Sequence, residues 1–285
     1  MTETSLGEPV AAELVRGRPY DERPILLEAN SVQVTYNRVA VAISGVSLKV
    51  PEASIVAVLG SNGAGKTTTL RGLTGFLPGE NGAVTAGSFL FQGRELPGKY
   101  PHQIARVGIV LVPERNKVFA TLTVDENLAA VVTRAGGNRQ RMLDLAFEVF
   151  PALTALRSRR GGFLSGGERQ MLAIAKALVA DPVLLLVDEL SLGIAPALVI
   201  RLMASLTTIR DAMGISILLV EQNAAAALQI ADHAYVMETG RIVLEGSPDE
   251  LRSNPEVQQF YLGQSPDGEH RQYGATPRHR RSWGG

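Results

Sequence analysis

The chain has 285 residues and 45% of them are hydrophobic, which provides a substantial core and excludes wholesale disorder. Lysine and arginine total 28, and aspartate and glutamate also total 28, so the composition gives no argument for a nucleic acid or another anionic partner. Cysteine is absent, which excludes disulfides and thiolate metal sites within this chain and is compatible with a reducing cytosol.

Residues 1–24 mix charge, glycine and proline without periodicity, and we expect them to form a flexible N-terminal arm. This segment lacks the apolar stretch of a secretory signal. The longest apolar runs, such as 183–187, are far shorter than the roughly 20 residues that a membrane helix needs. The sequence therefore predicts no transmembrane segment.

From Ile25 the character changes, and residues 26–34 and 46–50 are predicted as strands, with a turn at Asn37. Tyr36 lies between them, upstream of the next motif. A lone aromatic residue is more often a packing residue than a ligand contact, so Tyr36 indicates little by itself.

A glycine-rich segment follows the apolar run 55–59, which is predicted as a buried strand, and precedes a predicted helix. It matches G-x-x-x-x-G-K-[ST] in full, and strand, loop and helix are the context that this motif needs. Its glycines leave backbone N–H groups free to surround a phosphate, and the helix directs its positive end at the same point. This phosphate loop consists of Gly60, Ser61, Asn62, Gly63, Ala64, Gly65, Lys66, Thr67 and Thr68.

The last residues of the phosphate loop have side chains suited to a bound nucleotide. Lys66 supplies a mobile positive charge for the β- and γ-phosphates of ATP. The Thr67 hydroxyl is a hard oxygen ligand of the kind that Mg²⁺ prefers. We therefore expect an ATP and Mg²⁺ site here.

Further strands are predicted at 84–91 and 109–112, and the second is followed by Glu114. Ligands of open α/β sheets bind at the carboxyl ends of strands, so Glu114 is a candidate group on the phosphate or water side. An exposed glutamate taken alone is usually only solvated. Residues 123–157 have a helical pattern that begins with a capping box, Thr123 and Glu126, and ends at Pro151.

A second candidate anion site lies at a predicted helix start, where a serine hydroxyl and unobstructed N–H groups meet the positive end of the helix. Alone it could be a plain helix cap, but its position after a complete phosphate loop favours a binding role. This signature consists of Leu164, Ser165, Gly166, Gly167 and Glu168.

Two apolar strands end in polar residues. Residues 183–187 lead into Asp188 and Glu189, where Asp188 can hold Mg²⁺ together with Thr67 and Glu189 can act as general base toward water. Adjacent strand residues point in opposite directions, so we expect the two acids to take different roles. After the strand at 215–220, Gln222 can reach a γ-phosphate through its amide, although a polar strand end is an equally good interpretation.

The C-terminal part is predicted to contain a hairpin with its turn at 238–240, then helical residues 246–262. Residues 264–285 are rich in glycine, proline and arginine, and we expect a disordered basic tail. The four histidines of the chain do not cluster at metal-ligand spacing.

The order of these motifs resembles an ABC-type ATP-binding subunit over residues 25–263. The resemblance implies an α/β P-loop NTPase fold, with a mostly parallel core sheet, an antiparallel β portion and an inserted helical subdomain at about 116–180. Within that family the chain is similar to the ATPases of branched-chain amino acid importers and their urea and amide relatives. Four features support the similarity to this branch: Glu114 where most members have glutamine, Ala195 where they have aspartate, Gln222 where they have histidine, and the domain end 261–263.

The resemblance implies roles for the matching residues. Tyr36 would stack on adenine, and Glu189, Gln222 and Glu114 would serve catalysis. The signature would bind the γ-phosphate of an ATP held by another subunit, so each ATP would lie across a dimer. Leu190 departs from the family, which usually has proline there.

The resemblance also implies partners. We expect a homodimer, or a heterodimer with a second ABC ATPase, on integral-membrane permease subunits at the cytoplasmic face of the plasma (inner) membrane. An extracytoplasmic substrate-binding protein would be an indirect partner, and no nucleic acid is expected. The alternative is a soluble non-transport ABC ATPase of DNA repair, translation or iron–sulfur assembly. Residues 114–164 contain no sustained heptads of the kind that repair members carry, and the single cassette is unlike translation members. A P-loop kinase would lack the signature.

Overall fold

The computed structural model describes residues 15–96, 100–115 and 117–260. Most of the predicted arm (1–14), the predicted tail (264–285) and the family-like domain end at 261–263 lie outside the described residues.

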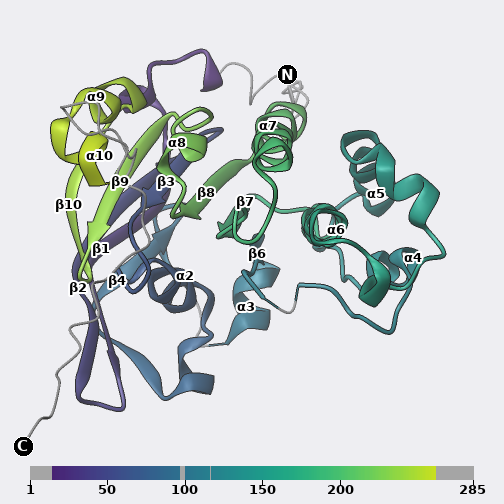
Figure 1. The fold of residues 1–285 in the computed structure, drawn as a ribbon. Coiled ribbons are helices and arrows are strands. Elements are labelled where there is room, and N and C mark those ends of the chain that lie inside the picture. The colour runs from purple at the N-terminus through teal and green to yellow at the C-terminus, as the bar shows by residue number, and fades with distance from the viewer. Residues whose placement is uncertain (1–14, 97–99, 116, 261–285) are drawn as a thin grey trace, which may run out of the picture.

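Two sheets form the body of the protein (Figure 1). The first is antiparallel and has the order β2-β1-β4-β5. The second has the order β10-β9-β3-β8-β7-β6 and is parallel from β9 to β6, with β10 antiparallel at its edge. The strands are β1 (Ile25–Tyr36), β2 (Ala40–Pro51), β3 (Ile55–Leu59), β4 (Gly82–Phe91), β5 (Arg94–Glu95), β6 (Ile109–Val112), β7 (Leu184–Asp188), β8 (Ser216–Glu221), β9 (His233–Glu238) and β10 (Arg241–Gly246).

The central strands β3, β7 and β8 are buried at every residue, as expected for parallel strands covered on both faces. One core cluster lies on the sheet face that α2 and the antiparallel sheet cover. The other lies against α7 and α8 and continues without interruption into α6 and the helices beyond it. The helices are α2 (Lys66–Thr74), α3 (Pro101–Arg106), α4 (Val124–Ala129), α5 (Arg139–Val149), α6 (Gly166–Val179), α7 (Pro196–Met213), α8 (Ala224–Ala227), α9 (Pro248–Ser253) and α10 (Pro255–Phe260).

Helices α4, α5 and α6 form a lobe beside the sheets, on the right of Figure 1. The predicted capping box at Thr123 is confirmed, because its hydroxyl accepts from the Glu126 N–H and the Glu126 carboxylate accepts from the Thr123 N–H. The continuous helical pattern predicted for 123–157 is broken between α4 and α5, where Asn138 caps the second helix. This arrangement confirms the predicted α/β fold with a parallel core sheet, an antiparallel portion and inserted helices.

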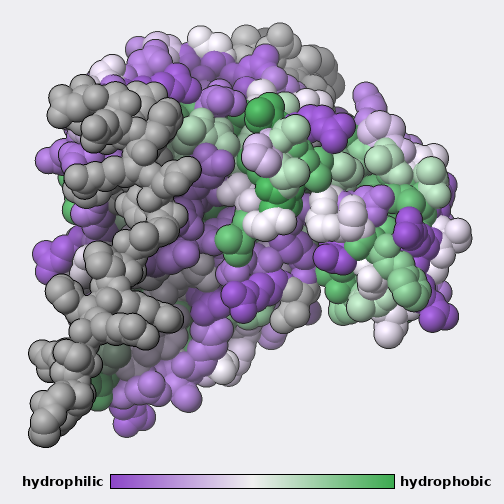
Figure 2. Space-filling model, in the orientation of Figure 1, coloured by the Kyte–Doolittle hydropathy of each residue, from purple (hydrophilic) through white to green (hydrophobic). Residues whose placement is uncertain are grey.

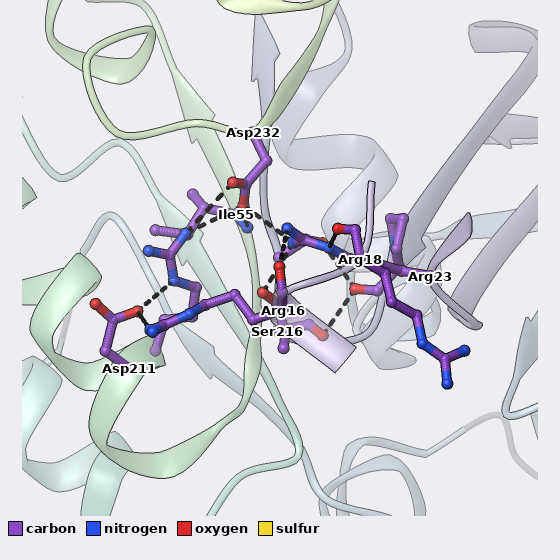
Figure 3. Close-up of polar contacts among 11 residues, drawn as sticks. Arg16, Arg18, Arg23, Ile55, Asp211, Ser216 and Asp232 are labelled. Atoms are coloured by element: carbon purple, nitrogen blue, oxygen red, sulfur yellow. Dashed lines mark hydrogen bonds and ion pairs between the residues drawn. The ribbon is translucent and has the colours of Figure 1, made fainter. Parts of the chain in front are cut away.

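Residues 15–23, which we name the N-terminal strap, lie against the domain, although the sequence predicted a flexible arm for this segment. Arg23 donates to the carbonyl oxygens of Arg16 (2.9 Å), Arg18 (3.2 Å) and Ala53 (3.2 Å), and its side chain is 9% exposed. Asp232 faces it and accepts from the Ile55 N–H at 2.7 Å (Figure 3). The strap is thus fastened at the beginning of β3.

Candidate functional site

The carboxyl ends of β3, β7, β8 and β6 lie at one edge of the parallel sheet because these strands run in the same direction. The phosphate loop follows β3, Glu189 follows β7, Gln222 follows β8, and Glu114 is the second residue after β6. The fold therefore brings these four predicted groups to one edge, as expected for ligand sites of open α/β sheets.

The phosphate loop has the backbone that its glycines were expected to allow. Gly63 and Gly65 have positive φ angles of 81° and 106°, which side-chain-bearing residues rarely adopt. A Cβ atom at Gly65 would lie 2.7 Å from Ile43 Cγ2, and one at Gly60 would lie 2.4 Å from the Met237 carbonyl oxygen. The loop and the start of α2 border a pocket of about 290 Å³, which Val41, Ala42, Glu189 and Thr239 also line.

Lys66 is almost fully buried and faces oxygen atoms. Its Nζ donates to the carbonyl oxygens of Gly60 (2.8 Å) and Ser61 (3.0 Å), and it forms an ion pair with Glu189 Oε1 at 3.2 Å. These contacts hold the ammonium group against the loop from which the pocket is built.

Thr67, in the first turn of α2, contacts Asp188, the last residue of β7. Thr67 Oγ1 donates to Asp188 Oδ1 at 3.0 Å. Burial raises the pKa of Asp188 to about 6; the Thr67 hydrogen bond opposes this shift, and the charges of Glu189 and Glu114 add to it. The predicted pair is thus brought together, with one hydroxyl and one carboxylate oxygen side by side.

The expectation that Asp188 and Glu189 point in opposite directions along one strand is wrong. Strand β7 ends at Asp188, and Glu189 has a left-handed φ of 46°, so the alternation of strand side chains does not extend to it. Both carboxylates reach the first turn of α2, where one contacts Thr67 and the other Lys66.

Glu114 and Gln222 lie at the margin of this group. Glu114 forms an ion pair with Arg115 Nε at 3.0 Å and is partly exposed. Its charge is close enough to raise the pKa of Asp188. Gln222 is exposed, directly after the fully buried Glu221.

Glu221 was not singled out from the sequence, although it ends an apolar strand as Asp188 does. Its Oε1 accepts from the Ser191 N–H at 2.9 Å and its Oε2 accepts from Ser191 Oγ at 2.6 Å. Burial raises the pKa of Glu221, and the hydrogen bonds from Ser191 and Asn223 oppose this shift. The strand-end position was the available signal, but its partner lies 30 residues away in the sequence.

The signature lies at the start of α6 in the helical lobe. Ser165 caps this helix in a second capping box, in which its hydroxyl accepts from the Glu168 N–H. A Cβ atom at Gly166 would meet nothing within 4 Å, so the backbone here is open to a ligand. None of residues 164–168 lines the phosphate-loop pocket.

Tyr36 is placed apart from that pocket. Its ring lies against Gly82, where an added Cβ would be 2.8 Å from Tyr36 Cε1, and its buried hydroxyl has no hydrogen-bond partner among the described residues. Val41 and Ala42 of the following strand line the pocket instead.

A family model described as ABC transporter matches residues 43–191, which contain the phosphate loop, the signature and the two carboxylates. The chain belongs to the ABC transporter family. The high-affinity branched-chain amino acid transport ATP-binding protein BraG of Pseudomonas aeruginosa is 41% identical over 84% of this chain and 100% of that protein. The probable branched-chain amino acid transport ATP-binding protein LivF of Archaeoglobus fulgidus is 37% identical over 74% of this chain and 87% of that protein.

A further relative and a solved structure extend the comparison. The lipopolysaccharide export system ATP-binding protein LptB of Acidithiobacillus ferridurans is 34% identical over 84% of this chain and 97% of that protein. A crystal structure of an ATP-binding cassette of an ABC transporter in its ADP conformation has a TM-score of 0.70 and 27% identity, covering 84% of this chain and 99% of that one.

This ABC protein is an ATP-binding subunit, an ATPase whose activity is coupled to transport, as the sequence predicted. Subunits of this kind work with membrane permease components. Across the described ranges, no helix combines the length and the apolar character that crossing a membrane requires.

Proposed function

We propose that this subunit powers an importer of branched-chain amino acids or of a related small amide such as urea. The observation that carries the proposal is the 41% identity to BraG over the full length of that protein. In this proposal the chain lies at the cytoplasmic face of the plasma membrane through its permease, and a substrate-binding protein outside the membrane delivers the cargo.

The phosphate loop holds ATP and the pair Thr67 and Asp188 holds Mg²⁺. The donor set fits these groups: the glycine backbone leaves space at Gly63, where an added Cβ would meet nothing within 4 Å. The adjacent oxygens of Thr67 and Asp188 match the preference of Mg²⁺ for a few protein oxygens beside substrate phosphates. When bound, Mg²⁺ neutralises charge that develops on the phosphates.

Glu189 is the general base toward the attacking water. Its carboxylate is paired with Lys66 at 3.2 Å, and phosphate oxygens compete for the same ammonium group. When Lys66 turns to phosphate, the carboxylate is released to accept a proton from water. Gln222 orients phosphate or water only, because an amide cannot take up a proton as histidine does.

Three further assignments complete the site. The signature contacts the γ-phosphate of an ATP bound to a second subunit, either another copy of this chain or a sister ABC ATPase. The open backbone at Gly166 supports this contact. Tyr36 provides the stacking surface for adenine, and this requires its ring to turn away from Gly82. Glu114 lies at the joint between the nucleotide and the permease.

The helical lobe is the permease-docking side. Between α4 and α5 a groove of about 420 Å³ has an apolar lining of Leu128, Leu143 and Phe147, with the Asp125–Arg157 ion pair (2.8 Å) also at its surface. Figure 2 shows hydrophobic side chains among polar ones over this lobe. Such a mixed groove suits a short amphipathic segment of the permease.

The test is to isolate the protein from a detergent extract of its native membranes and to identify its companions by mass spectrometry. Polytopic permease subunits of an amino acid or amide transporter are the expected result, and uptake of labelled leucine into vesicles containing the purified complex would then identify the substrate class. Lipopolysaccharide export proteins would overturn the import assignment. Repair, ribosomal or cluster-assembly proteins without a permease would favour the soluble alternative.

A further inference from the structure

Glu221 fastens the segment that follows β7 to the end of β8. Ser191 donates twice to its carboxylate, through the backbone N–H at 2.9 Å and through Oγ at 2.6 Å. Two residues earlier, the Glu189 N–H donates to the Val220 carbonyl oxygen at 2.9 Å. The chain is therefore held to β8 on both sides of Leu190.

These ties surround a strained residue. Glu189 has a φ of 46°, in the left-handed region that is sterically unfavourable for a residue with a side chain. Such strain persists only where the surroundings over-determine it. The left-handed turn is also what carries the Glu189 carboxylate to Lys66, at 3.2 Å, instead of along the strand alternation.

A carboxylate at position 221 suits the task of holding Ser191, because both of its oxygens accept hydrogen bonds. Glu221 is 0% exposed, and a buried charge is unfavourable unless hydrogen bonds satisfy it. Its two oxygens accept both donors of Ser191, and Oε2 also accepts from the Asn223 N–H at 3.4 Å. An amide at this position would present an N–H₂ group to one of these donors and lose that bond.

We propose that Glu221 is a positioning residue for ATP hydrolysis, which holds Ser191, and through it the backbone of Glu189, so that the Glu189 carboxylate is directed at the phosphate loop. The Asn223 N–H also donates to Glu221, so the same carboxylate contacts the segment that contains Gln222. The proposal rests on the role of Glu189 as general base given above. It makes Glu221 the connection between the two polar strand ends, without contact to ATP.

The test measures single-turnover hydrolysis of labelled ATP by the full-length protein, together with its affinity for ATP. Glu221→Gln is expected to lower the rate at least tenfold and to leave the ATP dissociation constant within twofold, because Glu221 is not part of the phosphate loop. Ser191→Ala removes only the Oγ bond to a charged acceptor and is expected to lower the rate about fivefold. A normal rate for a folded Glu221→Gln protein would overturn the proposal.

Matched controls come from α9, where Glu250 accepts from the Ser247 N–H at 2.8 Å and from Ser247 Oγ at 2.7 Å. Here too one serine donates through its N–H and its hydroxyl to one glutamate, although both bonds go to Oε2 and the pair lies at the surface, at a helix start. Glu250→Gln and Ser247→Ala are expected to leave both the hydrolysis rate and the ATP affinity unchanged.

A double-variant cycle separates positioning from general support of the fold. If Glu221 acts through Glu189, Glu221→Gln adds less than twofold to the loss caused by Glu189→Gln. A purely structural role predicts instead that the two losses multiply and that ATP affinity falls with the melting temperature. If Glu221→Gln does not fold, Ser191→Ala enters the same cycle. A normal rate for Glu189→Gln would overturn the general base and this proposal together, whereas a normal rate for Glu221→Gln beside a slow Glu189→Gln would overturn this proposal alone.

Discussion

At the scale of single residues, Lys66 is the centre of the site. An ammonium group has three N–H donors, and Lys66 has three oxygen partners, from Gly60, Ser61 and Glu189. In the proposed mechanism, a phosphate that binds here competes for this ammonium group with the carboxylate of the proposed base. In this proposal, phosphate binding and activation of the general base both depend on the Lys66 side chain.

Glu189→Gln is expected to slow hydrolysis by about 10²- to 10⁴-fold, the usual contribution of a general base, while ATP still binds. The variant should accumulate as an ATP-bound dimer, which size-exclusion chromatography with and without ATP would detect. Asp249→Asn, at a side chain that is 95% exposed, is the control and should behave as the unmodified protein. Unchanged hydrolysis by Glu189→Gln would remove this residue from the mechanism.

Asp188 gives a prediction about pH. Burial raises its pKa to about 6, above the ordinary value near 3.8, so the folded state binds this proton more tightly than the unfolded chain does. Without nucleotide or Mg²⁺, Asp188→Asn should therefore raise the free energy of unfolding at pH 7.5 by about 2 kcal/mol, after a discount for solvent screening. The advantage should shrink as the pH falls through 6 toward 4.

Urea unfolding at pH 7.5 and at pH 5 would measure this difference for both proteins. The same substitution should abolish Mg²⁺-dependent hydrolysis, so stability and function would change in opposite directions. An Asp188→Asn protein that is less stable at pH 7.5 would contradict the assignment of a buried, destabilising charge.

At the scale of elements, local signals were sufficient where a motif determines its own geometry. Strand β3 has the predicted bounds 55–59, and the helix after the phosphate loop begins within the motif, at Lys66. Helix α7 was not predicted, although its buried residues recur at intervals of three and four: Val199, Leu202, Met203, Leu206 and Ile209. That helix was predictable from its period.

Contacts between distant segments were not predictable in this way. The strap is held by backbone carbonyl oxygens and by Asp232, which no local pattern around residues 15–23 reveals. The Ser191–Glu221 contact was not predictable either, because neither residue belongs to a local motif and the two are 30 residues apart in the sequence. The local motif fixes which residues can bind phosphate, whereas the tertiary fold decides which of them are held in place.

The strap yields a stability prediction. Arg23→Ala removes three hydrogen bonds from a side chain that is 9% exposed, and should lower the free energy of unfolding by about 2–3 kcal/mol. Arg16→Ala is the control, because its ion pair with Asp211 is about 40% exposed on both sides and should contribute less than about 1 kcal/mol. A loss of less than about 1 kcal/mol for Arg23→Ala in urea unfolding, no larger than that of the exposed Arg16 pair, would contradict a stabilising role for the buried Arg23 side chain.

At the scale of the whole molecule, the phosphate loop and the signature belong to different parts of one chain. The first follows β3 in the sheet, the second begins α6 in the lobe, and none of residues 164–168 lines the phosphate-loop pocket. A complete ATP site in the proposed arrangement therefore needs two subunits. One core cluster runs from the parallel sheet into α6, so the lobe is packed directly against the strands that carry the carboxylates.

The isolated protein should therefore hydrolyse ATP slowly, and the rate per molecule should rise with protein concentration. Steady-state assays over a hundredfold range of concentration would measure this dependence. Addition of the permease in detergent should raise the rate and remove the dependence, because it holds two subunits together. A fast rate that is independent of concentration would contradict the need for a second subunit.

The order of strands in the parallel sheet has a consequence for which fragments of the chain can build it. The stretch shared with the family model ends at Ser191, yet β3 has only β8 and β9 as neighbours, and both come later in the chain. A gene fragment that ended there would encode the phosphate loop on a strand with no neighbour on either edge, and Ser191 without Glu221. A fragment of this chain must therefore extend through residue 238 before β3 has both of its neighbours, β8 and β9.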